Sequence, residues 1–256
     1  MNRINQLLEN KKQNILSVYF TAGYPELNDT EKIIIELEKA GVDLIEIGIP
    51  FSDPLADGPV IQQSSEKALS NGITLNKIFK QLKDIRQKVN IPLILMGYLN
   101  PVMQFGMENF CQKAAEIGID GTIIPDLPLD IYEKEYKQLF QKYGLSNILL
   151  ITPQTSSERL KTIDKTTDSF IYMVSSASTT GTKGISNDVL STFYEKIKQA
   201  GVQSPRLIGF GISDKESFEN ACQYANGAII GTAFIKALAK KGSLTEKIHD
   251  FVESIE

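Results

Sequence analysis

The sequence predicts an α/β protein, a single (β/α)8 TIM barrel that spans residues 1–256. Short apolar runs alternate with longer amphipathic stretches, and 256 residues is close to the ~250 that such a barrel needs. The first run is not followed by a Gly-x-Gly-x-x-Gly fingerprint, which counts against an open dinucleotide-binding sheet. No linker or low-complexity stretch divides the chain, so we expect one domain.

The apolar runs predict the strands. They are residues 16–20, 44–47, 93–96, 122–124, 148–151, 170–174, 206–210 and 227–230. Near-continuous apolar runs of this length are typical of parallel strands that are covered on both faces. Eight of them in a row, with helical segments between, favour closure into a barrel.

The amphipathic stretches predict the helices. They include residues 29–40, 108–117, 131–143, 187–200 and 215–224. Several end at a glycine just before the next strand, as at Gly41, Gly118 and Gly201, and glycine there can take the left-handed conformation that closes a helix. We also expect an extra N-terminal helix, and a final helix that carries the only histidine, His249, on a solvated face.

Two connections are unusually long. Residues 48–59, rich in Pro, Gly and Asp, follow the second strand and begin a gap of nearly two strand–helix units. Residues 175–186, rich in Ser, Thr and Gly, follow the sixth strand. Loops after strands lie on the active-site face of such barrels, and long loops are usually functional.

Composition and charge exclude several other classes of protein. The net charge is −4 and no basic block occurs, so a nucleic-acid binder is not expected. Cys111 and Cys222 fall in predicted helices and are too few for a disulfide framework or a zinc site. The N-terminus is too polar for a secretory signal, and Pro and Gly interrupt the uncharged stretches. These features predict a cytoplasmic protein that does not bind membranes.

Two carboxylates are the candidate catalytic groups. An enzyme without an available histidine must move protons with Asp, Glu, Lys, Tyr or Cys. Glu46 lies in an apolar strand near its carboxyl end, where an unpaired carboxylate is costly. It is either a general acid/base with a raised pKa or one half of a structural ion pair. Asp57, on the following loop, could act on the same substrate from another side, or could simply belong to an Asp-Gly turn. The sequence shows no metal cluster and no lysine within a strand run, which favours neither metal nor Schiff-base catalysis.

Glycine-rich segments after the last three strands predict an anion site. Thr180 and Gly181 follow the sixth strand, Gly211 follows the seventh, and Gly231 follows the eighth, ahead of a short helix that we expect Thr232 to cap. Backbone N–H groups of glycine loops and of a helix N-terminus bind phosphate, and barrels often place this site after strands seven and eight. The alternative is that these are turn and packing glycines.

The run from Glu46 to Pro59, Glu-Ile-Gly-Ile-Pro-Phe-Ser-Asp-Pro-Leu-Ala-Asp-Gly-Pro, resembles the signature of the tryptophan synthase α-subunit family. Residues 96–101, 125–128, 209–213 and 231–233 match further motifs of the family in the same order, so the resemblance covers essentially the whole chain. It implies a lyase that cleaves indole-3-glycerol phosphate to indole and glyceraldehyde 3-phosphate. It also implies a β-subunit partner in an αββα tetramer, with pyridoxal phosphate in that partner and no cofactor in this chain.

The resemblance also implies roles for individual residues. Glu46 and Asp57 match the two catalytic acids. The phosphate end matches Phe210, Gly211, Gly231, Thr232, Thr180 and Gly181. The indole pocket matches Tyr19, Met96, Tyr98, Ile123, Tyr172 and Ile229. Asp53 and the Asn100-Pro101 segment are expected to contact the β subunit. The chain departs from the common pattern in residues 175–181, which lack the usual Arg and Gly-Val, and at Thr232, where serine is common.

Two other functions remain open on the residues alone. A phosphosugar isomerase would share the phosphate site, but it would not require the Asp-Pro-Leu-Ala-Asp-Gly loop or an aromatic-lined pocket. A barrel that serves as a regulatory or binding subunit would not need both Glu46 and Asp57. Turnover of indole-3-glycerol phosphate separates these possibilities.

Overall fold

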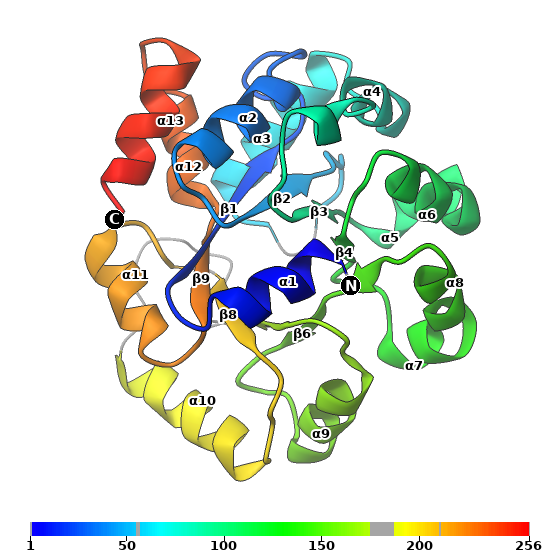
Figure 1. Ribbon diagram of the computed structural model, residues 1–256, viewed down its shortest axis with the longest axis vertical. Coiled ribbons are helices and arrows are strands. Elements are labelled where there is room, and N and C mark those ends of the chain that lie inside the picture. Colours follow the sequence, from blue (N-terminus) through cyan, green and yellow to red (C-terminus); the bar gives the residue numbers. More distant parts are fainter. Residues whose placement is uncertain (1, 55–56, 175–186, 210, 256) are drawn as a thin grey trace.

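A ring of parallel strands forms the centre of the molecule, as Figure 1 shows for the computed structural model, which describes residues 2–54, 57–174, 187–209 and 211–255. The strands are β1 (Ile15–Thr21), β2 (Leu44–Gly48), β3 (Leu93–Met96), β4 (Gly121–Ile123), β5 (Ser146–Asn147), β6 (Leu149–Ile151), β7 (Ile171–Val174), β8 (Arg206–Gly209) and β9 (Gly227–Ile230). All pairings are parallel, in the order β5-β4-β3-β2-β1-β9-β8-β7-β6. Only Ile148 separates β5 from β6, so these two form one broken strand and complete a barrel of eight.

Helices surround the strands in an outer ring (Figure 1). They are α1 (Arg3–Asn10), α2 (Thr30–Lys39), α3 (Pro59–Ser70), α4 (Leu75–Gln81), η1 (Ile85–Gln87), α5 (Leu99–Phe105), α6 (Met107–Glu116), α7 (Leu129–Ile131), η2 (Tyr132–Tyr136), α8 (Lys137–Lys142), α9 (Ser157–Thr166), α10 (Asn187–Gln199), α11 (Lys215–Cys222), α12 (Thr232–Leu238) and α13 (Leu244–Glu253). The predicted TIM barrel is therefore confirmed.

Two apolar layers hold the barrel together. Residues that point outward from the strands, such as Val18 and Phe20 on β1, pack against the helices. Residues that point inward, such as Ile15 on the same strand and Leu44 on β2, fill the barrel itself. This alternation follows from the two-residue period of a strand. It explains why the strand runs are apolar at nearly every position.

Helix α1 closes one end of the barrel, and the predicted N-terminal extra helix is confirmed. Figure 1 shows it lying across the middle of the ring. Its buried residues Ile4 and Leu8 join the inward-facing cluster. The helix is fixed at this end because Arg3 pairs with the buried carboxylate of Asp120 at 3.1 Å, and Asp120 also pairs with Arg86. The barrel is thus closed at the amino-terminal ends of its strands.

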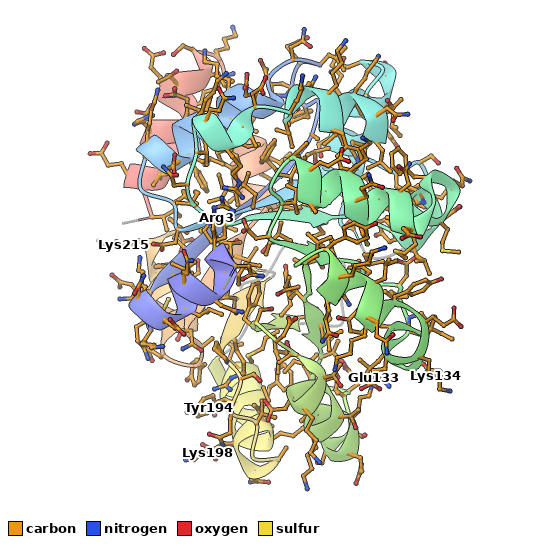
Figure 2. The ribbon with its side chains drawn as sticks, turned by 45° about the vertical axis from the view of Figure 1, so that its right-hand side comes forward. Arg3, Glu133, Lys134, Tyr194, Lys198 and Lys215 are labelled. Carbon is orange, nitrogen blue, oxygen red and sulfur yellow. The ribbon has the colours of Figure 1, made fainter. Side chains whose placement is uncertain are left out.

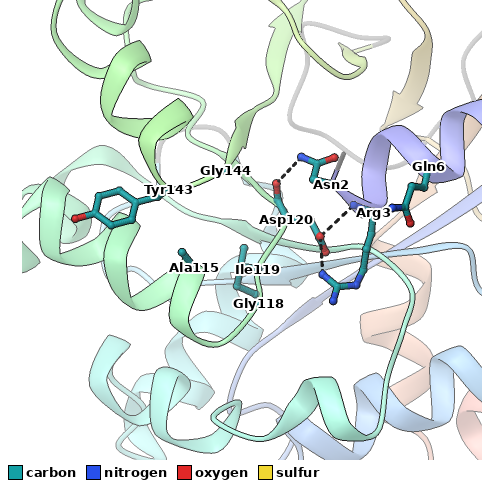
Figure 3. Close-up of a pocket in the computed structure, with 9 residues that line it drawn as sticks. All are labelled: Asn2, Arg3, Gln6, Ala115, Gly118, Ile119, Asp120, Tyr143 and Gly144. Atoms are coloured by element: carbon teal, nitrogen blue, oxygen red, sulfur yellow. Dashed lines mark hydrogen bonds and ion pairs between the residues drawn. The ribbon is translucent and has the colours of Figure 1, made fainter.

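A polar cavity of about 390 Å³ lies beside this ion pair. Asn2 and Arg3 line it from one side, and Ile119 and Asp120, which precede β4, line it from another (Figure 3). The cavity therefore lies at the amino-terminal end of the strands. Active sites of such barrels lie at the opposite end, so this cavity is not the catalytic pocket.

The structure differs from the sequence prediction in three places. The long gap after the second strand contains two α-helices, α3 and α4, and the short helix η1 in addition to the loop. The fifth strand is broken at Ile148, and the helix expected over 131–143 begins at Leu129 and includes a π-helical segment, η2. The predicted helix-closing glycines are confirmed: φ is +101° at Gly41, +79° at Gly118 and +76° at Gly201.

Several charged side chains of the outer helices point away from the barrel interior. Figure 2 shows Lys134, Lys198 and Lys215 at the edge of the molecule. His249, on α13, lies 3.3 Å from Glu36 of α2, and its side chain is 42% exposed, as predicted for a helix face.

Cys111 and Cys222 are buried free thiols on helices. Within the described ranges no helix is both long and apolar enough to cross a membrane.

Candidate active site

The carboxyl ends of the strands bring together the residues predicted for the pocket. Strand pairing places Tyr19 beside Glu46, and Glu46 beside Ile94. Met96 pairs with Ile123 one step further round the ring. Tyr172 and Ile229 belong to the same inward-facing cluster as Ile123, and Met96 packs against that cluster. Residues from six strands therefore converge on one space inside the barrel.

Glu46 is fully buried in this space, with an exposed fraction of 0%. Its Oε1 accepts a hydrogen bond from the Ser17 hydroxyl at 3.1 Å, whereas its buried Oε2 has no hydrogen-bond partner. In the part of the chain that the structure describes, no cation pairs with it, so the ion-pair interpretation is not supported. Burial raises the pKa of Glu46 from 4.5 to about 8, and the Ser17 hydrogen bond opposes the rise. The carboxyl is therefore mostly protonated at neutral pH.

Asp57 lies at the end of the loop that follows β2, just before α3. Its pKa is raised by burial, and a hydrogen bond with the Tyr98 side chain opposes that shift because it stabilises the charged form. The Gln62 side chain, from α3, donates to the Asp57 carbonyl at 2.8 Å. Tyr98 packs in turn against Phe51, with ring centroids 5.4 Å apart. Hydrogen bonds thus hold both the side chain and the backbone carbonyl of Asp57, so Asp57 is more than an exposed turn residue.

Two tyrosine hydroxyls of the pocket lie directly against glycines, in space that a larger residue would occupy. A Cβ on Gly48 would lie 2.2 Å from the Tyr19 hydroxyl, and a Cβ on Gly209 would lie 2.0 Å from the Tyr172 hydroxyl. Any larger residue at either position would displace the ring. Burial is the main cause that raises the pKa of both tyrosines, and the nearby charge of Asp57 contributes to both. The same causes include Glu46, so the two acids and the two tyrosines share one electrostatic environment.

The predicted phosphate end is described only in part. Gly211 has a φ of +77°, and Gly231 immediately precedes α12, between β9 and that helix. Thr232 is the first residue of α12 and not its cap: Gly231 occupies the cap position, with no side-chain hydrogen bond. The expectation that Thr232 caps the helix is wrong because the helix begins one residue earlier than predicted. Thr180, Gly181 and Phe210 lie outside the described residues.

Sequence reasoning missed three features of this pocket. Ser17 holds Glu46, the two glycines Gly48 and Gly209 accommodate tyrosine hydroxyls, and Gln62 holds the Asp57 backbone. Ser17 did leave a signal, because it is a polar residue in an apolar strand run. A glycine at the end of a strand, by contrast, does not reveal which side chain it makes room for. Among the described residues no cluster of three or more His, Cys, Asp or Glu side chains could hold a metal ion.

These features define a TIM-barrel enzyme with a buried carboxyl group, Glu46, near the carboxyl end of its second strand and a second buried acid, Asp57, on the next loop. A family profile described as tryptophan synthase alpha chain matches residues 5–255. The chain belongs to this family. It accordingly cleaves indole-3-glycerol phosphate to indole and glyceraldehyde 3-phosphate, the α-subunit step of tryptophan biosynthesis.

Individual relatives match over all or nearly all of their length. The tryptophan synthase alpha chain of Flavobacterium johnsoniae is 60% identical and is covered completely by the match, as is this chain. That of Bacteroides thetaiotaomicron is 54% identical, with 94% of each chain covered. Among solved structures, the tryptophan synthase alpha chain of Legionella pneumophila has a TM-score of 0.87 at 34% identity, covering 100% of this chain and 96% of its own.

Proposed function

We propose that Glu46 is the proton shuttle of the lyase reaction and that Asp57 stabilises the positive charge that develops on the indole ring. The observation that carries this proposal is the fully buried Glu46 carboxyl, which has one oxygen unpartnered and whose pKa is raised by burial to about 8. A protonated acid in an apolar pocket suits the first step, which is protonation of the ring. Turnover of indole-3-glycerol phosphate by the purified chain tests it.

The reaction is a retro-aldol cleavage whose protons balance at Glu46. The Glu46 carboxyl donates its proton to C3 of the indole, which gives an indolenine with positive charge at the ring nitrogen. Asp57 accepts a hydrogen bond from the N1–H and lowers the energy of that cation. The Glu46 carboxylate then takes the proton of the side-chain hydroxyl as the bond from C3 breaks. The bonding electrons return to the ring, the aldehyde is released, and Glu46 is again protonated.

The apolar wall of the pocket fits indole, the second product of the cleavage. Met96, Ile123 and Ile229 would contact the indole faces and edges, and Tyr19, Tyr98 and Tyr172 would surround it with aromatic surface. This arrangement favours an aromatic substrate over the small phosphosugar of an isomerase. The proposed chemistry requires only the two acids, so we infer that this chain, as a single cytoplasmic domain, carries no cofactor of its own.

We place the substrate phosphate on backbone N–H groups around Gly211, Gly231 and Thr232, together with the Thr180–Gly181 and Phe210 segments. Thr232→Asp tests this assignment with little risk to folding, because a carboxylate in the first turn of a helix is stabilising. We expect KM for indole-3-glycerol phosphate to rise about 100-fold with kcat largely kept, because two negative charges would meet. Thr232→Asn, neutral and similar in size, is the matched control and should raise KM only a few-fold. Equal KM values for the two variants would place the phosphate elsewhere.

We propose that the partner is a β subunit that uses pyridoxal phosphate, in an αββα tetramer, and that it docks on the active-site face. Asp53 and Asn100 are exposed near this face, and Met103, on the same helix as Asn100, is 50% exposed. Indole is neutral and apolar and would escape to water from an isolated chain. This gives a physical reason to join the face to the enzyme that consumes indole.

Docking is expected to raise the turnover of the lyase. Asp57 ends the loop after β2, so its position depends on that loop, and closing loops over a site can limit kcat. We expect kcat to increase at least about ten-fold when the cognate β subunit is added. The measurement is lyase turnover with and without that subunit. Equal rates would refute the coupling and leave the roles of Glu46 and Asp57 untouched.

A further inference from the structure

A buried hydroxyl lies directly beneath the proposed proton shuttle. Ser17, on β1, is fully buried and pairs with Leu44 of β2 and Ile229 of β9. Both neighbours belong to the apolar cluster inside the barrel. A polar group in such surroundings costs free energy unless it forms a hydrogen bond. The bond that Ser17 forms is the one it donates to Glu46 Oε1, at 3.1 Å.

The Ser17 hydrogen bond reaches Glu46 from the side of the barrel end that α1 closes. Glu46 pairs with Tyr19 across β1 and β2, so Ser17 lies two residues closer to the end that α1 closes. A hydroxyl at that depth draws Oε1 toward the floor of the barrel. The other oxygen, Oε2, is buried and has no hydrogen-bond partner. One oxygen of the carboxyl is therefore fixed by the protein and the other is left for a reacting group.

We propose that Ser17 is a positioning residue for the lyase reaction: its hydroxyl fixes the Glu46 carboxyl through Oε1 and thereby presents Oε2 to the substrate. Glutamate has several rotatable bonds, and a single anchor at its end removes most of its freedom before substrate arrives. The inference rests on the proposed role of Glu46. It adds that the geometry and the proton affinity of this acid are both set by a residue that need not touch substrate.

The Ser17 hydroxyl shifts the pKa of Glu46 in a definite direction. The Ser17 hydrogen bond stabilises the charged carboxylate and so lowers the pKa of Glu46 against the effect of burial. Removing the hydroxyl leaves burial unopposed. A hydroxyl that only filled space in the core would change stability when removed, but it would not move the titration of Glu46.

The test is Ser17→Ala, with two readouts. The first is the pH profile of lyase turnover, in which we expect the pKa assigned to Glu46 to move up by about one unit and kcat to fall about ten-fold. The second is independent of activity: the infrared band of the protonated Glu46 carboxyl, identified by its loss in Glu46→Gln, is followed through a pH titration. It should persist to higher pH in Ser17→Ala than in the parent.

Three further variants make the test decisive. Ser17→Thr keeps the hydroxyl and should return the titration toward the parent. Ser17→Cys keeps the volume with a weaker donor, should show a smaller upward shift, and decides the matter if Ser17→Ala does not fold. Thr122→Val is the matched control, because it removes another buried hydroxyl of the barrel, bonded to Asn147 at 3.1 Å, and should leave the titration unchanged.

A Glu46 titration in Ser17→Ala or Ser17→Cys that coincides with the parent would overturn the proposal. So would a shift of equal size in Thr122→Val. Failure of the proposed function has a different outcome, because Glu46→Gln would then remain active. If Glu46→Gln is inactive while the Ser17 variants titrate like the parent, only the positioning role of Ser17 is lost.

Discussion

Glu46→Gln is expected to fold normally and to lose lyase turnover by about 10³-fold or more. A single positioned acid or base contributes about 10²–10⁴-fold, and Glu46 serves here as both. Glutamine keeps the volume of the side chain, and its carbonyl oxygen can still accept the Ser17 hydrogen bond. It can neither give a proton to indole C3 nor take one from the hydroxyl. The measurement is kcat with indole-3-glycerol phosphate at saturation.

Retention of the fold must be shown for the same variant, by far-ultraviolet circular dichroism and by binding of the product analogue glycerol phosphate. Turnover within a few-fold of the parent would mean that Glu46 is a structural residue, and the mechanism would then be wrong. Reduced binding with unchanged kcat would instead assign Glu46 to substrate affinity.

The same substitution should remove a pH dependence of stability. The folded chain holds the Glu46 proton up to a pKa of about 8, whereas the exposed side chain of the unfolded chain releases it near 4.5. Stability from this group is therefore complete below about pH 4.5 and is lost as the pH rises through about 8. The free energy of unfolding of the parent, measured with urea, should decrease over that pH range relative to that of Glu46→Gln. Parallel curves for the two proteins would show that burial does not perturb this carboxyl.

The sequence predicted the barrel well because its strands are apolar on both faces and its helices are amphipathic. Both patterns are local, and both are visible in a single sequence. The broken fifth strand was not predicted, since residues 148–151 form one continuous apolar run and nothing marks a break at Ile148. The start of α12 was misplaced by one residue because Gly231 and Thr232 are both acceptable at a helix cap.

Within the site, Glu46 was predictable because a carboxylate in an apolar strand is anomalous by itself. Its contact with Ser17 was not predictable, although both residues lie in predicted strands. The contact depends on the stagger between β1 and β2, which aligns Tyr19 with Glu46 and so places Ser17 one layer below. A two-residue period tells which side chains point inward, but it does not tell how neighbouring strands are displaced along the barrel axis.

Asp57→Asn is expected to lower kcat by about 10²–10³-fold while KM changes only a few-fold. The cation on the indole nitrogen exists in the transition state and the intermediate, and not in the bound substrate, so losing the negative charge affects mainly the chemical step. Asparagine is similar in size, and its side-chain oxygen can still accept the hydrogen bond from Tyr98. The proposed phosphate site, around Gly211 and α12, follows β8 and β9, whereas Asp57 follows β2, so this site should keep substrate bound.

Tyr98→Phe separates the charge of Asp57 from its orientation. It removes the hydroxyl that bonds to the carboxylate but keeps the ring that packs against Phe51. We expect a loss of kcat of about ten-fold, smaller than that of Asp57→Asn and of the same kind, because the charge remains and only its anchor is gone. Steady-state kinetics on both variants decides the role of Asp57. If KM rises steeply in Asp57→Asn while kcat survives, Asp57 is a binding residue, and the growing charge on the indole nitrogen must be stabilised by another group.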